Sequence, residues 1–255
     1  MSPSPKSRFR ERNKKMDIKE FSNLMIDYGK EINILFTEEQ LQKFYQYMNL
    51  LIEWNEKINL TAIVEPKEII LKHFIDSLTI IKYIEPKKSV IDIGTGAGFP
   101  GIPIKIMRED LDITLLDSLN KRIHFLNEVI QKLELKNITA VHARIEEYAK
   151  NKQYRESFDV ATSRAVANLT TLSEYMLPMV TLKGMAICMK GSEISEEISK
   201  SKNSIKLLGG EIDKIEKFTL PKSDNKRNLI LIRKYRQTPG KYPRKPGIPS
   251  KEPLY

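Results

Sequence analysis

The chain has 255 residues, of which 40% are hydrophobic and 30% charged, a composition typical of a folded protein with one large or two smaller domains. No apolar stretch approaches the ~20 residues that a membrane-spanning helix needs, and the single cysteine excludes an intrachain disulfide framework. The three histidines have no cysteine partners and no metal-ligand spacing, so no metal site is expected.

The net charge of +10 is concentrated at the two ends of the chain. Residues 1–16 hold six Lys/Arg and one Glu, and residues 233–255 hold seven Lys/Arg and one Glu, which leaves −1 for the middle. Basic ends of this kind are typical of segments that bind phosphate backbones, but solvated tails that aid solubility have the same composition. Residues 1–16 also lack the apolar core of a secretory signal, so a cytoplasmic protein is expected.

Residues 17–85 predict a helical N-terminal cap. A helical pattern begins at Asp17, Thr37 and Gln40 match a capping box, and Pro66 is expected at the start of a further helix. Polar side chains are concentrated in the second half of this apolar region, at Asn59, Thr61, His73, Asp76 and Ser77. They are interpreted either as helix caps and core polar groups or as substrate contacts.

Strands and helices alternate over residues 86–235, which predicts an α/β domain. Strands are expected at 90–93, 112–117, 137–142, 158–162, 184–190, 211–220 and 228–235. No helix separates the last two, so a closing hairpin is expected to place an antiparallel strand in an otherwise parallel sheet. Residues 236–255 are basic and rich in proline, which predicts an irregular or extended tail.

A glycine-rich turn follows the first of these strands. Gly94, Gly96 and Gly98 occupy every second position, where the backbone needs positive φ values and must lie bare against a ligand. A helix is expected from about Pro100. In an open α/β sheet this turn lies at the carboxyl edge of the strands, where ligands bind.

The second strand ends in Asp117, an acid suited to a pair of ribose hydroxyls. NAD and S-adenosyl-L-methionine both carry such a ribose, so the turn and the acid together indicate an adenosyl ligand without choosing between them.

Arg164 follows the fourth strand and is expected to enter the same crevice. Its five donors suit a cofactor carboxylate, an RNA phosphate or an acid of the cap such as Asp76. A salt bridge that merely joins the cap to the sheet is the structural alternative.

Six motifs in a fixed order then suggest a family. They are Asn59-Leu-Thr-Ala-Ile63, His73-Phe-Ile-Asp-Ser-Leu78, Asp92-Ile-Gly-Thr-Gly-Ala-Gly-Phe-Pro-Gly101, Leu116-Asp-Ser-Leu-Asn-Lys-Arg122, Ser163-Arg-Ala-Val-Ala167 and Tyr242-Pro-Arg-Lys-Pro-Gly247. Over about residues 17–250 the chain resembles the RsmG or GidB family of bacterial 16S ribosomal RNA guanine-N7 methyltransferases, which are class I S-adenosyl-L-methionine-dependent enzymes. The basic residues before Met16 are not part of that pattern.

The resemblance implies a Rossmann-like class I methyltransferase fold, with a seven-stranded, mostly parallel sheet, a reversed last strand and a helical N-terminal cap. It also implies methyl transfer from S-adenosyl-L-methionine to N7 of one guanine in 16S ribosomal RNA of the small ribosomal subunit. A monomer without membrane contact is expected.

The resemblance also assigns cofactor contacts to particular residues. Gly94 and Phe99 lie in the first loop, Ile145 and Glu146 frame the adenine, and Arg164 lies beside the cofactor. The remaining predicted contacts are Gly96 and Gly98, from the glycine-rich turn, and Asp117, from the ribose argument.

Guanine N7 carries a free lone pair and loses no proton when it is methylated, so no general base is required. The purine becomes positively charged, and a nearby carboxylate would stabilise it. Asp76 is the candidate, with capping of a helix that begins at Ser77 as the alternative. Asn168 is expected either to bind the guanine edge or to cap the helix after the fourth strand.

Two other functions are compatible with parts of the sequence. An NAD-dependent oxidoreductase would need a nicotinamide site and an acid/base residue in a second large domain, which the sequence does not offer. A non-catalytic RNA-binding module would have a decayed cofactor site, whereas the three glycines and Asp117 are intact.

Overall fold

The computed structural model describes residues 16–164 and 167–254. Its elements are, in chain order, α2 (Ile18–Glu31), α3 (Glu38–Ile58), α4 (Pro66–Ile69), the π-helix η1 (Ile70–Ile75), α5 (Asp76–Leu78), η2 (Ile81–Tyr83), β1 (Ser89–Ile93), α6 (Gly101–Met107), β2 (Asp112–Asp117), α7 (Asn120–Lys132), β3 (Ile138–His142), α8 (Ile145–Tyr148), β4 (Phe158–Arg164), α9 (Leu169–Met176), η3 (Leu177–Met179), β5 (Val180–Lys190), α10 (Ser195–Leu207), β6 (Gly210–Thr219), β7 (Lys226–Lys234) and α11 (Ile248–Lys251).

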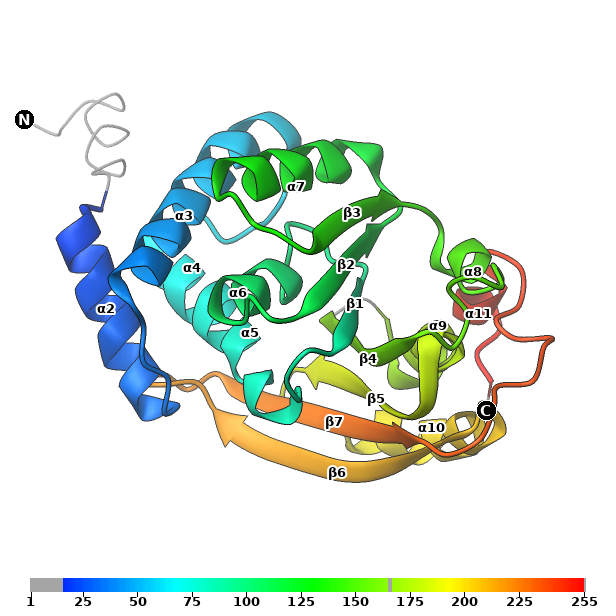
Figure 1. Cartoon of the computed structure of the whole chain (residues 1–255). Coiled ribbons are helices and arrows are strands. Elements are labelled where there is room, and N and C mark those ends of the chain that lie inside the picture. The colour runs from blue at the N-terminus through cyan, green and yellow to red at the C-terminus, as the bar shows by residue number, and fades with distance from the viewer. Residues whose placement is uncertain (1–15, 165–166, 255) are drawn as a thin grey trace, which may run out of the picture.

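The seven strands form one sheet in the order β3-β2-β1-β4-β5-β7-β6 (Figure 1). Strands β1 to β5 are parallel, and β7 is antiparallel to both of its neighbours. The predicted α/β fold with a reversed last strand is therefore confirmed. Strand β4 continues two residues beyond its predicted end, to Arg164, because β5 pairs with it as far as Met189.

Helices cover both faces of the sheet, and each face has its own apolar core. On one face α6 and α7 pack on the sheet, and α3 of the cap packs on these two helices. Phe44 and Phe74 of the cap belong to the same buried cluster as Leu115 of β2. Helices α9 and α10 pack together on the other face, over a second cluster. The cap thus shares its core with the sheet.

The local predictions for the cap are confirmed at two helix starts. Thr37 and Gln40 form a reciprocal capping box at α3, and Pro66 occupies the first turn of α4. The backbone then stays helical without a break through η1 and α5. Asp76 therefore lies inside a helix, and the prediction that it might cap one beginning at Ser77 is wrong.

The C-terminal tail packs on the body of the protein, and α11 is a helical turn within the expected irregular segment. The Arg155 guanidinium donates to the carbonyl oxygens of Thr238, Pro239 and Tyr242. Arg244 donates three side-chain hydrogen bonds to the carboxylate of Glu174, a fully buried residue of α9, at 2.7, 3.0 and 3.2 Å. The tail is therefore held on the body of the protein and is not a solvated segment.

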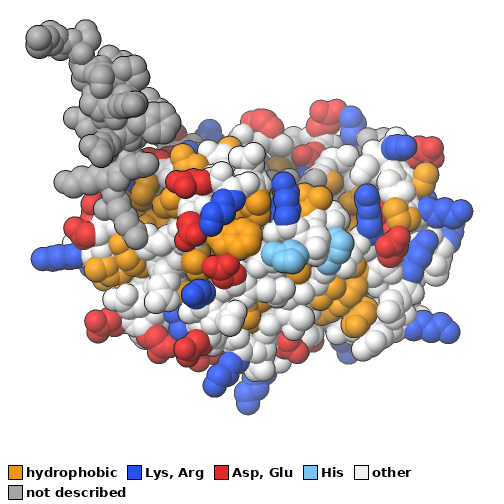
Figure 2. All heavy atoms as spheres, turned by 90° about the horizontal axis from the view of Figure 1, so that it is seen from above, with side chains coloured by type: hydrophobic (Ala, Val, Ile, Leu, Met, Phe, Trp, Pro, Cys, Tyr) orange, Lys and Arg blue, Asp and Glu red, His pale blue; other side chains and the backbone are white. Residues whose placement is uncertain are grey.

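Acidic and basic side chains are interspersed on the upper surface of the molecule (Figure 2). This mixture agrees with the near-neutral charge of the central sequence. Within residues 16–164 and 167–254, no helix is long and apolar enough to cross a membrane. The basic segment 1–16 lies almost entirely outside the described residues, as do Ala165 and Val166 of the fifth motif.

Replacing Arg244 by methionine is expected to destabilise the protein by about 3 kcal/mol, because the buried Glu174 carboxylate would lose its cation. The exposed neighbour Lys245 provides a matched control, since Lys245→Met removes the same charge from the same segment. Urea unfolding of both variants measures the difference. Equal stabilities would contradict a tail held by the Glu174 pair.

Candidate active site

A cavity of about 680 Å³ opens at the carboxyl edge of the parallel strands, between the cap and the sheet. Its volume lies in the range of small-molecule sites. The lining residues come from the cap, the glycine-rich loop, the first turn of α7 and the ends of β2, β4, β5 and β7; they are Leu60, Thr61, Ile63, Lys72, His73, Asp76, Gly94, Thr95, Gly96, Ala97, Phe99, Asp117, Ser118, Arg122, Arg164, Met189, Lys190, Gly191 and Arg227.

The glycine-rich loop forms one wall of this cavity. Gly94 and Gly96 have φ values of 65° and 62°, as predicted from the sequence. A Cβ on Gly96 would meet no other atom closer than 4.0 Å, so the loop backbone is bare at this point. The main chain can therefore be approached closely by a ligand.

Asp92 holds the two ends of the loop together from beneath. Its Oδ2 accepts hydrogen bonds from Thr95 Oγ1 at 2.6 Å and from the Gly101 amide at 2.9 Å. Asp92 is fully buried, and burial raises the pKa of its carboxyl group to about 6. Asp92 was not predicted as a site residue, because its partners lie across the turn.

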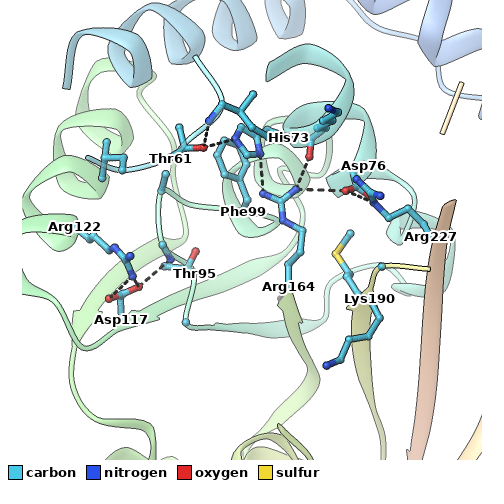
Figure 3. A pocket seen from close by; sticks show the side chains of 18 of the residues that line it. Thr61, His73, Asp76, Thr95, Phe99, Asp117, Arg122, Arg164, Lys190 and Arg227 are labelled. Carbon is cyan, nitrogen blue, oxygen red and sulfur yellow. Dashed lines mark hydrogen bonds and ion pairs between the residues drawn. The ribbon is translucent and has the colours of Figure 1, made fainter. Parts of the chain in front are cut away.

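Asp117 ends β2 beside the loop, with its side chain 2% exposed (Figure 3). Its carboxylate accepts from the amides of Gly96 and Leu119, each at 2.9 Å, and pairs with Arg122 at 3.0 Å. Asp117, which was predicted to bind the ribose, thus lines the cavity together with Gly94, as the topology of a parallel sheet predicts.

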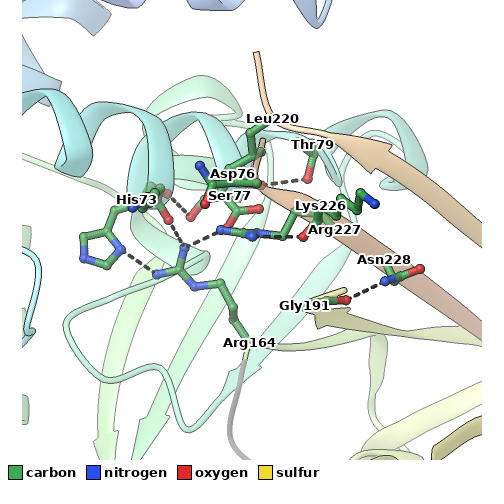
Figure 4. Close-up of polar contacts among 12 residues, drawn as sticks. His73, Asp76, Ser77, Thr79, Arg164, Gly191, Leu220, Lys226, Arg227 and Asn228 are labelled. Atoms are coloured by element: carbon green, nitrogen blue, oxygen red, sulfur yellow. Dashed lines mark hydrogen bonds and ion pairs between the residues drawn. The ribbon is translucent and has the colours of Figure 1, made fainter. Parts of the chain in front are cut away.

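Arg164 crosses from the end of β4 to the cap (Figure 4). Its Nη1 donates to the Lys72 carbonyl oxygen at 2.9 Å and lies 3.8 Å from Asp76 Oδ2, while its Nη2 lies 3.1 Å from His73 Nδ1. The guanidinium carbon also lies 5.0 Å from the centre of the Phe99 ring. The cap-to-sheet bridge considered for Arg164 is therefore present in the structure.

The imidazole of His73 stacks on Phe99, with ring centres 4.4 Å apart and planes inclined by 15°. Burial and the Arg164 guanidinium lower the pKa of His73 to about 3, so the ring is neutral near pH 7. Since arginine only donates, Nδ1 must accept, and the proton of the neutral ring lies on Nε2. That nitrogen donates to Thr61 Oγ1 at 2.9 Å.

The remaining predicted residues are divided between the cavity and its surroundings. Asp76 lines the cavity. Asn168 is exposed and caps α9, accepting from the Thr171 amide at 3.0 Å. Ile145 and Glu146 begin α8 and are not among the lining residues. Glu146 is buried and accepts from the Gly247 amide of the tail at 2.9 Å.

Four cationic residues of the cavity were not predicted as site residues from the sequence: Lys72, Arg122, Lys190 and Arg227. Lys190 ends β5, a position that strand topology alone would have indicated. Arg227 begins β7, and because β7 runs against the other strands, its first residues lie at their carboxyl edge. Among the described residues, no group of three His, Cys, Asp or Glu side chains is placed to hold a metal ion.

The strand order, the reversed last strand and a bare glycine loop facing a cavity define the class I methyltransferase fold. Two solved structures share this fold: the putative transferase PH0793 from Pyrococcus horikoshii, at 12% identity over 64% of this chain and 63% of that one, and the [4+2]-cyclase SpnF, at 12% identity over 79% and 97%. Both have a TM-score of 0.52.

Sequence comparison identifies the family within this class. Residues 40–230 match the GidB family model, described as rRNA small subunit methyltransferase G. Proteins named ribosomal RNA small subunit methyltransferase G from Desulforamulus reducens and Acetivibrio thermocellus are 55% and 52% identical, over 89% and 94% of this chain and 95% and 100% of those proteins. The chain therefore belongs to the GidB family.

The neutral state of His73 predicts a pH-dependent contribution to stability. In the unfolded chain its pKa is 6.5 and in the folded protein about 3, so stability is lost as pH falls below 6.5. The stability difference between the wild type and His73→Asn should shrink by about 2 kcal/mol from pH 7 to pH 5.

Urea unfolding of both proteins at the two pH values measures this difference. The raised pKa of Asp92 acts in the opposite direction, but it is common to both proteins and cancels. A difference that stays constant would show that His73 titrates normally.

Proposed function

We propose that this protein transfers the methyl group of S-adenosyl-L-methionine to N7 of guanine 527 in 16S ribosomal RNA. The observation that carries this proposal is a single cavity with two unlike ends, in a chain of the GidB family. One end has the glycine loop and Asp117, and the other has cationic and acidic side chains from the cap and β7 (Figure 3).

The first end fits the cofactor chemically. The glycine loop, which is bare at Gly96, together with the carboxylate of Asp117, suits the adenosyl part of the molecule. Phe99 and Arg164 also line the cavity and complete the set proposed around the cofactor. Gly98 does not line the cavity, because its α-carbon faces the side chains of Tyr47 and Ile102, so the expectation of bare backbone at Gly98 is wrong. When bound, this cofactor supplies a methyl group on a sulfonium, which is reactive toward a lone pair.

The protein's own contribution is alignment and exclusion of water. Guanine N7 needs no proton removed, so the residues around it must hold the purine plane and its approach direction. Such alignment contributes up to about 7–11 kcal/mol to the lowering of a barrier. Asp76 is proposed to stabilise the charge that the purine acquires.

Ile145 and Glu146 are proposed to frame the adenine from α8, where the tail bonds to Glu146. Asn168 caps α9 with its side chain. A contact with the guanine edge is proposed as its second role. The protein is proposed to act as a monomer in the cytoplasm, with the small ribosomal subunit or its RNA as partner.

The test of this function is the position of the modified base. Ribosomal RNA from cells with and without this protein is reduced and cleaved at N7-methylguanine, and the break is mapped. A break at guanine 527 only in the presence of the protein is expected. A break that persists without the protein, or that appears elsewhere, would overturn the proposal.

Asp117→Ala is expected to weaken S-adenosyl-L-methionine binding by about 1.5–3 kcal/mol, the range for hydrogen bonds to a charged group. Asp112→Ala is the control, because this exposed acid begins the same strand at the opposite edge of the sheet. Titration calorimetry measures both affinities. Equal affinities in the two variants would remove Asp117 from the cofactor site.

A further inference from the structure

One carboxylate oxygen in the cavity is without a partner. Asp76 has its side chain 4% exposed, and its Oδ2 accepts from Arg227 Nε at 2.9 Å (Figure 4). Its Oδ1 is buried and has no hydrogen-bond partner among the described residues. A buried polar atom left without a partner costs roughly 1–3 kcal/mol. A ligand with a suitable hydrogen-bond donor would therefore supply the partner that Asp76 Oδ1 lacks.

The position of Asp76 restricts which ligand can do so. The residue lines the cavity at the end formed by the cap and β7, with Phe99 and Arg164 between it and Asp117 (Figure 3). A ligand in contact with Asp76 thus lies beyond the proposed cofactor end. Rotation about the Cβ–Cγ bond of an aspartate exchanges its two oxygens, so either oxygen can be presented to the cavity.

A carboxylate accepts hydrogen bonds and donates none. Guanine presents two adjacent donors, N1–H and the N2 amino group, on its Watson–Crick edge, whereas adenine presents an acceptor at N1. Atom N7 lies on the opposite side of the purine from this edge. A guanine held by N1 and N2 at Asp76 would consequently direct N7 back toward the cofactor end.

We propose that Asp76 is the residue that selects guanine, by accepting hydrogen bonds from N1–H and the N2 amino group of the target base. The inference rests on the proposed function. Arg227 and Arg164 pair with one oxygen of Asp76, and this pairing leaves the other oxygen for the base. Methylation at N7 makes N1–H a stronger donor, so the contact strengthens as the reaction proceeds.

The experiment combines a change in the enzyme with a change in the base. The target guanosine is replaced by inosine, which keeps N1–H and N7 but lacks the N2 amino group. Both RNAs are assembled into small ribosomal subunits, and single-turnover methyl transfer is measured. The wild type is expected to methylate guanosine about 10–100-fold faster than inosine, the effect of one hydrogen bond to a charged acceptor.

In Asp76→Ala this preference should fall to nearly 1, whereas a purely structural role would slow both substrates equally and leave the preference intact. Glu216→Gln is the matched control, because Glu216 also joins the cap to the sheet, through Lys82 and Tyr83, but lies outside the cavity. Its guanosine preference should equal that of the wild type.

Asp76→Asn keeps the shape of the side chain and one neutral acceptor, so this variant is measured in place of the alanine variant if the latter does not fold. It should show a preference below that of the wild type. A wild-type preference of 1, or an unchanged preference in the Asp76 variants, would overturn the inference. Failure of the wild type to methylate guanosine at N7 would instead overturn the proposed function.

Discussion

The Arg164 guanidinium joins the cap to the sheet across the cavity, and the arrangement of the surrounding side chains depends on it. Because a guanidinium only donates hydrogen bonds, its polar neighbours must present acceptors. They are the Lys72 carbonyl, the Nδ1 of His73 and the Asp76 carboxylate. The neutral tautomer of His73 follows, and with it the bond to Thr61. A single cation at the end of β4 thus determines the polar surface of the cap that faces the cavity.

The parts of the site set by local backbone geometry were predictable from the sequence. The positive φ values of the glycine loop and the location of Asp117 follow from a strand, a turn and the rule that parallel strands open at one edge. Two roles were predicted for Asn168, guanine binding and helix capping, because a polar residue before a helix is compatible with either. The structure shows the capping bond, which depends only on a residue three positions away.

The contacts that complete the site were not predictable, because they join residues far apart in the chain. Asp76 and Arg227 are 151 positions apart and lie on different layers, and no periodicity in either segment links them. The contacts of the C-terminal tail were not predictable from composition either. Composition treats Arg244 as a free cation, whereas in the structure it pairs with the buried carboxylate of Glu174.

The attachment of the tail also bears on the order in which the protein can be completed during synthesis. Glu146 and Glu174 precede the groups that satisfy them, the Gly247 amide and the Arg244 guanidinium, by 101 and 70 positions, so the two carboxylates are synthesised first. A nascent chain therefore lacks these two partners until translation has passed Gly247. The packing of the tail on α8 and α9 can therefore form only after all seven strands of the sheet have been synthesised.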